Sequence, residues 1–210
     1  MTQTRTVLPR GRHAAPREIV RQSQHERMLG AMAEAVAEKG YGRASVADVI
    51  ERAGVSRKTF YEHFANKEEC FLAAYDAGAD LLLSAIEEAV AAELPDWLAA
   101  TRAGTRAYLE TLAANPAFAR TFMLEVLAAG PVALERRTLI LDRFAQQLVT
   151  LTAAARASAP ELPAHPPHVY EASVGAVSEL VARQLLRAGP ESLPGIAGAL
   201  VDVQLRLLGP

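Results

Sequence analysis

The 23 residues from Ser45 to Lys67, SVADVIERAGVSRKTFYEHFANK, decide how the rest of this chain is interpreted. Ser45 can cap the start of a helix, because its hydroxyl can accept the backbone N–H of Asp48 three residues later. The apolar residues that follow recur with the spacing of one helical face, at Val46, Val49, Ile50 and Ala53. This spacing predicts a short amphipathic helix that ends before Gly54.

A second short helix is expected after a tight turn. Gly54 can adopt the left-handed conformation that ends a helix, and Ser56 can cap the next one. Phe60 and Phe64 lie four residues apart, so they share a face that can pack on the first helix. The side chains left facing outward are basic, aromatic or polar, namely Arg57, Lys58, Thr59, Tyr61 and His63. Two helices joined by a glycine turn form the helix-turn-helix layout, whose second helix enters the major groove of DNA.

The flanking residues extend this pattern. Lys39-Gly40-Tyr41-Gly42 ends a preceding helix, and Asn66 and Glu69 have the spacing of a capping box at the start of the next one. The whole run, GYGRASVADVIERAGVSRKTFYEHFANKEE, strongly resembles the DNA-binding domain of the tetracycline-repressor (TetR) family. The resemblance is carried by Ala-Gly-Val-Ser at 53–56, Thr-Phe-Tyr at 59–61, His63-Phe64 and Lys67-Glu68.

Four residues of the second helix are expected to face double-stranded operator DNA. Arg57 and Lys58 begin that helix, where side chains can reach base edges or phosphates. Thr59 and Tyr61 are expected to contact base methyl groups or the DNA backbone. Together with Ser56, which caps the helix, these residues form the predicted DNA-reading surface.

The resemblance implies phosphate contacts for Ser45, His63 and Lys67. Ser45 and Lys67 lie at helix N-termini, whose dipoles favour anions. The complete predicted DNA-binding set is Ser45, Ser56, Arg57, Lys58, Thr59, Tyr61, His63 and Lys67.

Composition favours a soluble intracellular protein. A chain of 210 residues with 50% hydrophobic content suits one or two domains with a sizeable core. Charged residues interrupt every long apolar run, the first twenty residues contain no apolar signal segment, and Cys70 alone cannot build a disulfide framework. We therefore expect no membrane association and a cytoplasmic location.

Charge is unevenly distributed along the chain. Residues 1–69 hold 12 Lys and Arg against 9 Asp and Glu, whereas residues 70–210 hold 10 against 15. A mildly basic head on an acidic body fits a DNA-binding module carried by a body that does not itself bind DNA.

Three regions are expected. Residues 1–18 contain prolines and arginines without apolar periodicity and are interpreted as a disordered basic arm, either a tail without a role or an arm that touches phosphates or the minor groove. Residues 19–66 form the helix-turn-helix DNA-binding domain, beginning with a helix from Ile19 to Lys39. Residues 67–210 form a ligand-binding and dimerisation domain.

The body is predicted to be all-α. Apolar residues keep helical spacing up to Leu94-Pro95, and four prolines in residues 158–168 mark a linker. Further helical stretches are expected over residues 95–115, 118–127, 134–157, 170–185 and 193–207. With the head, this makes about nine helices, which resembles the TetR arrangement of a three-helix head and a helical regulatory body.

The last two helices are predicted to form a homodimer interface. Each carries a continuous apolar stripe with small residues beside it, and a monomer has little left against which to bury both stripes. The predicted interface residues are Val174, Val177, Val181, Leu185, Ile196, Leu200 and Val203.

Several body aromatics are candidates for ligand contact. In the TetR family the corresponding helices enclose an apolar cavity, so the resemblance implies a ligand site here. The candidates are Tyr75, Trp97, Tyr108, Phe122, Glu125 and Phe144. The alternatives are that the aromatics are ordinary core and that Glu125, which interrupts an apolar run, faces solvent.

We expect no catalytic residues, no cofactor and no metal site. The sequence contains no glycine-rich phosphate loop and no nucleophile elbow. His165 and His168 have only Glu161 and Glu171 as nearby partners, and Cys70 is interpreted as a small buried hydrophobe.

These features together predict a homodimeric transcriptional regulator, a repressor that a small apolar ligand releases from a palindromic operator. The alternative is a helical partner-binding or architectural protein without ligand-controlled DNA binding. The intact basic and aromatic residues of the head argue against that alternative, namely Arg57, Lys58, Tyr61 and Lys67.

Overall fold

The computed structural model describes residues 17–209, and over this range the chain is helical throughout, with no strand. The head contains α1 (Arg17–Lys39), α2 (Val46–Ala53) and α3 (Arg57–His63). The body contains α4 (Lys67–Ala91), α5 (Trp97–Ala114), α6 (Pro116–Met123), the 3-10 helix η1 (Glu125–Ala128), α7 (Pro131–Ala155), α8 (Pro167–Ala188), the 3-10 helix η2 (Pro190–Ile196) and α9 (Ala197–Leu208). The predicted all-α class is confirmed, and the arm predicted at 1–18 lies outside the described residues except for its last two, which begin α1.

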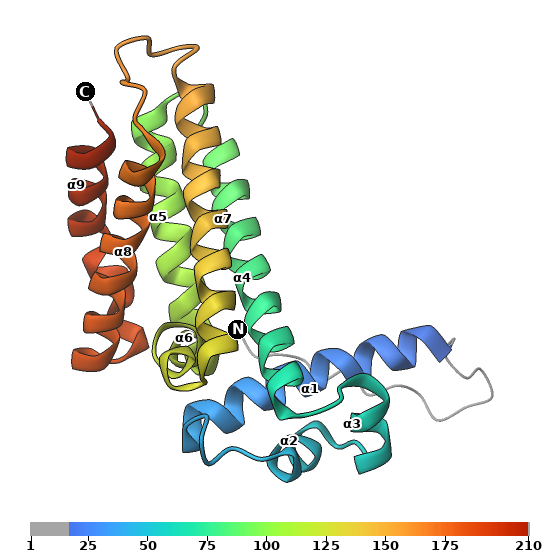
Figure 1. Ribbon diagram of the computed structural model, residues 1–210. Helices are drawn as coiled ribbons and strands as arrows, with labels where there is room; N and C mark the ends of the chain where they lie inside the picture. The colour runs from blue at the N-terminus through green and yellow to red at the C-terminus, as the bar shows by residue number, and fades with distance from the viewer. Residues whose placement is uncertain (1–16, 210) are drawn as a thin grey trace.

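The head lies across the foot of the body (Figure 1). Its three helices enclose buried side chains from each helix, including Met28 and Met32 of α1, Val49 of α2 and Phe60 of α3. Phe60 and Phe64 are both buried, with ring centroids 5.6 Å apart, as their spacing predicts.

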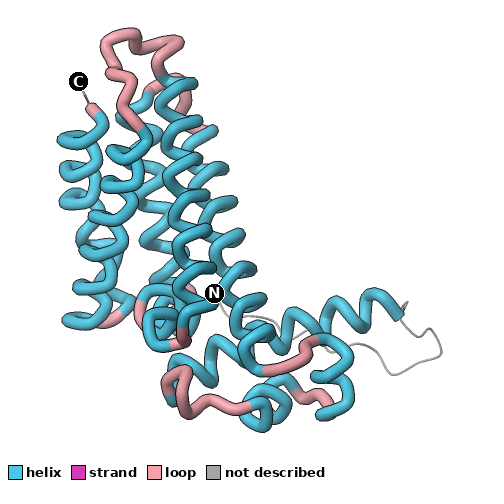
Figure 2. Tube along the Cα trace, in the orientation of Figure 1, coloured by secondary structure: helices cyan, strands magenta, loops and turns pink. Residues whose placement is uncertain are grey.

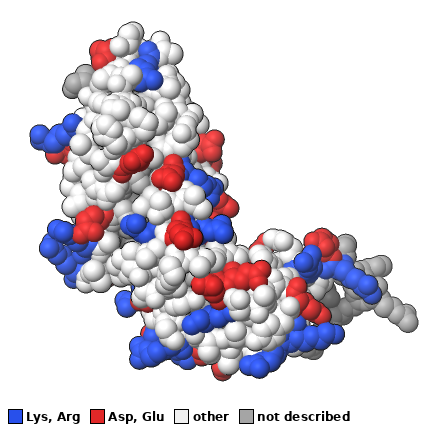
Figure 3. Space-filling view, viewed as in Figure 1, with Lys and Arg blue, Asp and Glu red and all other residues white. Residues whose placement is uncertain are grey.

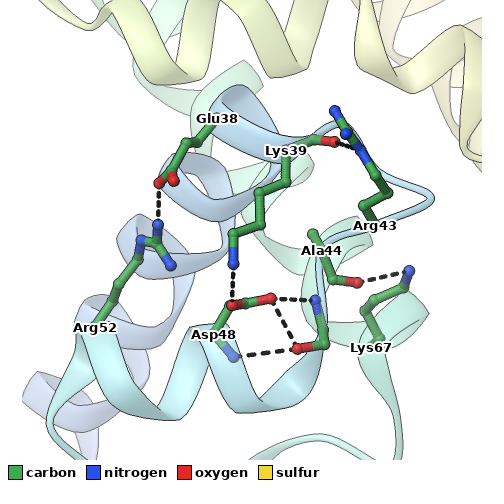
Figure 4. A network of polar contacts seen from close by, with 8 residues as sticks. Glu38, Lys39, Arg43, Ala44, Asp48, Arg52 and Lys67 are labelled. Atoms are coloured by element: carbon green, nitrogen blue, oxygen red, sulfur yellow. Dashed lines mark hydrogen bonds and ion pairs between the residues drawn. The ribbon is translucent and has the colours of Figure 1, made fainter.

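The capping residues predicted from the sequence lie at the ends of the head helices. Ser45 forms a capping box with Asp48, whose carboxylate accepts the backbone N–H and hydroxyl of Ser45 (Figure 4). Gly54 has φ 62° and ends α2, whereas Ser56 and Asn66 accept the backbone N–H groups that cap α3 and α4. The turn between α2 and α3 is therefore held by residues within a few positions of it.

The body is a bundle of long helices (Figure 1), with its loops gathered at the two ends of the bundle (Figure 2). α4 rises from the head and packs on α5, α7 packs on α8, and α8 packs on α9. The short helix α6 lies at the foot of the bundle and packs on α1. Buried residues of the head and of the body belong to one continuous core, in which α1 of the head packs on both α4 and α6.

Two predicted helices are shorter than expected. The helix predicted over 118–127 ends at Met123, and Leu127 and Ala129 then donate to carbonyls three residues back in η1. The stretch from 190 to 196 is 3-10 because Pro194 lacks the N–H that an α-helix would use. Only Ala197–Leu208 of the predicted last helix is α-helical.

The predicted dimer stripe is wrong for its central residues. Val181, Leu185 and Leu200 are buried inside a single chain, because α7, η2 and α9 cover the inner face of α8. Val174 and Val177 line a cavity between the body helices. Ile196 packs against the same core, and Val203 is half-buried. The apolar stripe therefore faces inward.

Among residues 17–209, no helix combines the length and the apolar character needed to cross a membrane.

Gly78 on α4 lets α6 approach closely, and its replacement is expected to destabilise the body. An added Cβ would lie 1.6 Å from Cε2 of Phe118, so the ring would have to move away. We expect Gly78→Ala to lower the free energy of unfolding by about 1–2 kcal/mol in urea titrations. Gly30 is the matched control on α1, where an added Cβ meets nothing within 4 Å and Gly30→Ala should stabilise by about 0.5–1 kcal/mol. Unchanged stability of the Gly78 variant would contradict the close packing.

Candidate DNA-reading helix and body cavity

The outer face of α3 carries the predicted DNA-reading residues. Arg57, Lys58 and Tyr61 are exposed, and the Tyr61 ring is half-exposed while its edge rests on Phe60. Lys58 lies 3.7 Å from Glu62 in a solvent-exposed ion pair, which is a weak interaction. Arg57 has no ion-pair partner among the described residues. These side chains are thus free to meet DNA.

The other predicted DNA-binding residues are more engaged within the head. The hydroxyls of Ser56 and Thr59 lie 2.9 Å apart, and Ser45 directs its polar groups at Asp48. Lys67 donates to the carbonyls of Tyr41 and Ala44, at 2.8 and 3.1 Å. Two of the three N–H donors of Lys67 are therefore used to hold the loop between α1 and α2 (Figure 4 shows the bond to Ala44).

His63 lies between the reading face and α1. Its ring centroid is 5.6 Å from that of His25, and burial together with the nearby His25 and Arg21 lowers the pKa of His63. A lowered pKa favours the neutral imidazole at neutral pH, so His63 contributes little positive charge to DNA binding. On the molecular surface, Lys and Arg side chains lie along the lower rim of the head with acidic side chains between them (Figure 3).

Acidic pH is expected to destabilise the head, because it protonates the Asp48 carboxylate. Hydrogen bonds from Lys39 and from Ser45 lower the pKa of the Asp48 carboxyl to about 2, below its value of about 3.9 in an unfolded chain. The stabilisation is therefore fully present above about pH 4 and is lost as the pH falls through 2. As the pH decreases over this window, the melting temperature of the wild type should fall more steeply than that of Asp48→Asn. Glu51→Gln, an exposed change on the same helix, should keep the wild-type slope, and equal slopes for the Asp48 variant would contradict this role.

The body contains a partly open cavity of about 100 Å³ between α4, α5, α6, α7, α8 and α9. Its aromatic lining includes Trp97, Tyr108, Phe122 and Phe144, all of which were predicted. The aliphatic lining consists of Ile86, Val90, Ala100, Gly104, Leu141, Leu148, Leu151, Ala155, Val174, Val177 and Leu208. The cavity runs along α5 from Trp97 near the far end of the bundle to Phe122 beside the head.

A few uncharged polar groups interrupt the apolar lining. The Thr105 hydroxyl donates to Oε1 of Gln204 at 2.7 Å, joining α5 to α9 across the cavity wall. Thr101, one turn earlier on α5, instead donates to the carbonyl of Trp97 in its own helix. The remaining polar lining residues are Gln147, Thr152 and Ser178.

A surface groove lies outside the same wall, between α4 and α7. The groove and the cavity share Ile86, Val90, Gln147, Leu148 and Leu151. These side chains form the wall between the cavity and the groove, where Gln147 donates to the carbonyl of Leu83 at 3.1 Å.

The head and the body have counterparts among known proteins. A profile of the tetR family of bacterial regulatory proteins matches residues 29–74, from the middle of α1 into α4. The HTH-type transcriptional regulator EthR of Mycolicibacterium smegmatis is 28% identical over 199 residues, covering 93% of this chain and 87% of EthR. The chain belongs to the TetR family. It is a DNA-binding transcriptional regulator with a helix-turn-helix head, and its family is not enzymatic.

Two further relatives are informative. The HTH-type transcriptional activator FasR of M. smegmatis is 30% identical over 82 residues, which cover 39% of this TetR-family chain and only 37% of FasR. FadR of Bacillus subtilis, solved in complex with stearoyl-CoA, superposes with a TM-score of 0.76 over 89% of this chain and 99% of FadR. At 18% identity the FadR likeness shows the fold alone.

Two predicted ligand residues do not line the cavity of this TetR-family chain. Tyr75 is fully buried in the core and stacks on Phe122 at 4.7 Å, so it supports the cavity wall from behind. Glu125 faces neither the cavity nor open solvent, which corrects both interpretations of that residue. Its carboxylate accepts the backbone N–H of Tyr41 at 3.1 Å and lies 3.6 Å from Nε of Arg120.

Glu125 instead joins the body to the head, a contact that sequence reasoning missed. Tyr41 lies in the loop before α2, packs its ring edge-on against Phe71 of α4, and lies under the Lys67 ammonium at 4.1 Å. A second contact runs beside it, because the buried Thr121 hydroxyl of α6 donates to the carbonyl of Ala33 in α1 at 3.2 Å. The two residues of each pair are more than 80 positions apart in the sequence, so no local pattern predicts either contact.

Cys70 and the possible metal ligands are the remaining candidate sites. Cys70 is fully buried, and burial raises the pKa of its thiol to about 12, which keeps it protonated. Within residues 17–209 no three His, Cys, Asp or Glu side chains gather as metal ligands would.

Proposed function

We propose that this TetR-family chain is a homodimeric repressor that a small apolar ligand releases from a palindromic operator. The observation that carries the proposal is the position of the cavity. One of its walls is Phe122 of α6, the short helix that packs directly on α1 of the head.

A ligand in the cavity would act on the head by two routes. Phe122 is flanked on α6 by Thr121, which bonds α1, so displacement of α6 would move α1. α4 lines the cavity at Ile86 and Val90, and only three residues separate it from α3, so its tilt would move the DNA-reading helix. Because two heads must meet successive major-groove faces roughly 34 Å apart, a shift of a few ångströms is enough to lower operator affinity.

The cavity favours a ligand with an apolar chain. Its lining is almost entirely aliphatic and aromatic, and its length along α5 suits an elongated molecule. At about 100 Å³ the cavity suits a small ligand, and a long chain would require it to widen. The FadR structure with stearoyl-CoA supports an acyl-type ligand in this fold.

The dimer would use the outer faces of α8 and α9, since their inner faces are covered. On α8, Leu186 is 68% exposed and an added Cβ at Gly175 would meet nothing within 4 Å. Gly198 on α9 is equally open. Small residues with an exposed leucine permit close helix packing across a two-fold axis. A monomeric mass in light scattering would overturn this arrangement.

The proposal is tested by measuring ligand affinity with and without operator. The operator would first be isolated as an inverted repeat near the gene that shifts in a gel with this protein, and a thermal-shift screen of apolar compounds would supply the ligand. Linkage requires that a ligand which loosens DNA binds operator-bound protein more weakly by the same factor, typically ~5–150-fold. Equal affinities would mean that the cavity does not control the head.

The direction of control is a separate question, because FasR is named an activator. A promoter reporter in cells with and without this chain distinguishes the two: repression predicts higher reporter output when the chain is deleted, and activation predicts lower output.

A further inference from the structure

The cavity wall carries no charge. Among the described residues, none of the side chains that line it is Asp, Glu, Lys, Arg or His. Burying a carboxylate or a phosphate without a partner is strongly unfavourable, so such a group would resist entering this site. Arg137 lies behind the wall and donates to Ser178 at 3.4 Å, but it does not itself line the cavity.

Gln204 offers a hydrogen-bond donor in this apolar space. Its Oε1 already accepts the Thr105 hydroxyl, which orients the amide group. Its Nε2 has no protein partner among the described residues. An amide with its oxygen satisfied and its N–H groups unused is suited to bind an acceptor such as a carbonyl oxygen.

The Thr105–Gln204 pair lies part-way along the cavity. On α5, Trp97 and Ala100 line the cavity on one side of Thr105, and Tyr108 lines it on the other, leading to Phe122. A ligand that fills the cavity and bonds Gln204 therefore has apolar groups on both sides of its acceptor.

We propose that the cavity binds an uncharged molecule in which a carbonyl group separates two apolar segments, as in an ester, a secondary amide or a thioester, and that Gln204 donates a hydrogen bond to that carbonyl. The inference rests on the proposed function of the cavity as the ligand site. It distinguishes an acyl derivative from the free acid, whose terminal carboxylate would meet no charged side chain on the cavity lining.

Two isomeric probes test the proposal on the wild-type protein. Ethyl hexanoate is neutral with an internal carbonyl, whereas octanoate has the same heavy atoms and a terminal charge at neutral pH. Titration calorimetry without DNA should show the ester binding at least 10-fold more tightly than the acid. Octanoate binding as tightly as the ester would overturn this proposal while leaving the ligand site intact. Binding of neither probe at millimolar concentration would overturn both.

Two glutamine variants test the assigned donor. Gln204→Met keeps the side-chain length but removes the N–H groups. It should lower the affinity for ethyl hexanoate about 5- to 100-fold. Gln146→Met is the matched control, because Gln146 is exposed on α7 in the groove outside the wall and does not line the cavity. The control should stay within about 2-fold of wild type by the same measure. Equal losses in both variants, with unchanged thermal unfolding, would overturn the role of Gln204.

Discussion

Replacing Arg57 by Ala is expected to remove most of the sequence-specific affinity for the operator. Arg57 is exposed in the first turn of α3, has no ion-pair partner among the described residues, and occupies the part of a reading helix that reaches base edges. One base-reading arginine contributes about 1–3 kcal/mol of discrimination. Because the proposed dimer reads two half-sites, the expected loss is about 2–6 kcal/mol, or roughly 30-fold and more.

Fluorescence anisotropy with the operator and with a scrambled duplex measures this effect. Arg57→Ala should weaken operator binding while leaving the scrambled duplex nearly unchanged. Lys58→Ala is the matched control on the adjacent position, where the side chain is 87% exposed. It should weaken both duplexes alike and reduce the salt dependence of binding. Operator affinity unchanged by Arg57→Ala would remove this residue from the reading surface.

The head was predictable because its conformation depends on short-range chemistry. Ser45, Gly54, Ser56 and Asn66 each satisfy backbone groups within a few residues, so their identities alone indicate where helices begin and end. The exposed face of α3 followed from the same periodicity, since the buried positions Phe60 and Phe64 leave the others outward.

The body was predictable in class but not in detail. Periodicity shows that α8 and α9 each have an apolar face, but it cannot show which neighbour covers that face. Val181 and Leu200 were assigned to a second copy of the chain, and the structure buries both within one chain. Polar pairs between distant helices were also beyond local patterns, as with Thr105 and Gln204, which are 99 residues apart.

Phe122 shows a different limit of prediction from the sequence. Its aromatic character and helical position were visible, and it lines the cavity as expected. Its neighbour Tyr75 has the same character but fills space in the core. Whether an aromatic side chain borders a void depends on the summed volumes of all surrounding helices, which no single stretch of sequence contains.

Glu125→Ala is expected to weaken the coupling between the cavity and the head, because Glu125 adds a third contact to those made by Thr121 of α6 and by α4. The carboxylate of Glu125 is the point where η1 of the body holds the backbone N–H of Tyr41, and Tyr41 also contacts Phe71 and Lys67 of α4. Glu125 does not line the cavity, so ligand affinity in the absence of DNA should stay within about 2-fold of wild type. The operator-dependent change in that affinity, expected at ~5–150-fold in the wild type, should shrink by about 2- to 10-fold, because one hydrogen bond contributes about 0.5–1.5 kcal/mol.

Two companion variants assign the effect to the Tyr41 contact. Glu125→Gln keeps an oxygen that can accept the Tyr41 N–H but loses the charge that faces Arg120, so it should retain most of the coupling. Arg120→Ala removes the same ion pair from the other side and should behave like Glu125→Gln, because a half-exposed ion pair contributes little. Calorimetric titration of each variant with ligand, with and without operator, gives the coupling directly. Full coupling in Glu125→Ala would leave Thr121 of α6 and the tilt of α4 as the connections that carry the signal, because these remain intact when the carboxylate is gone.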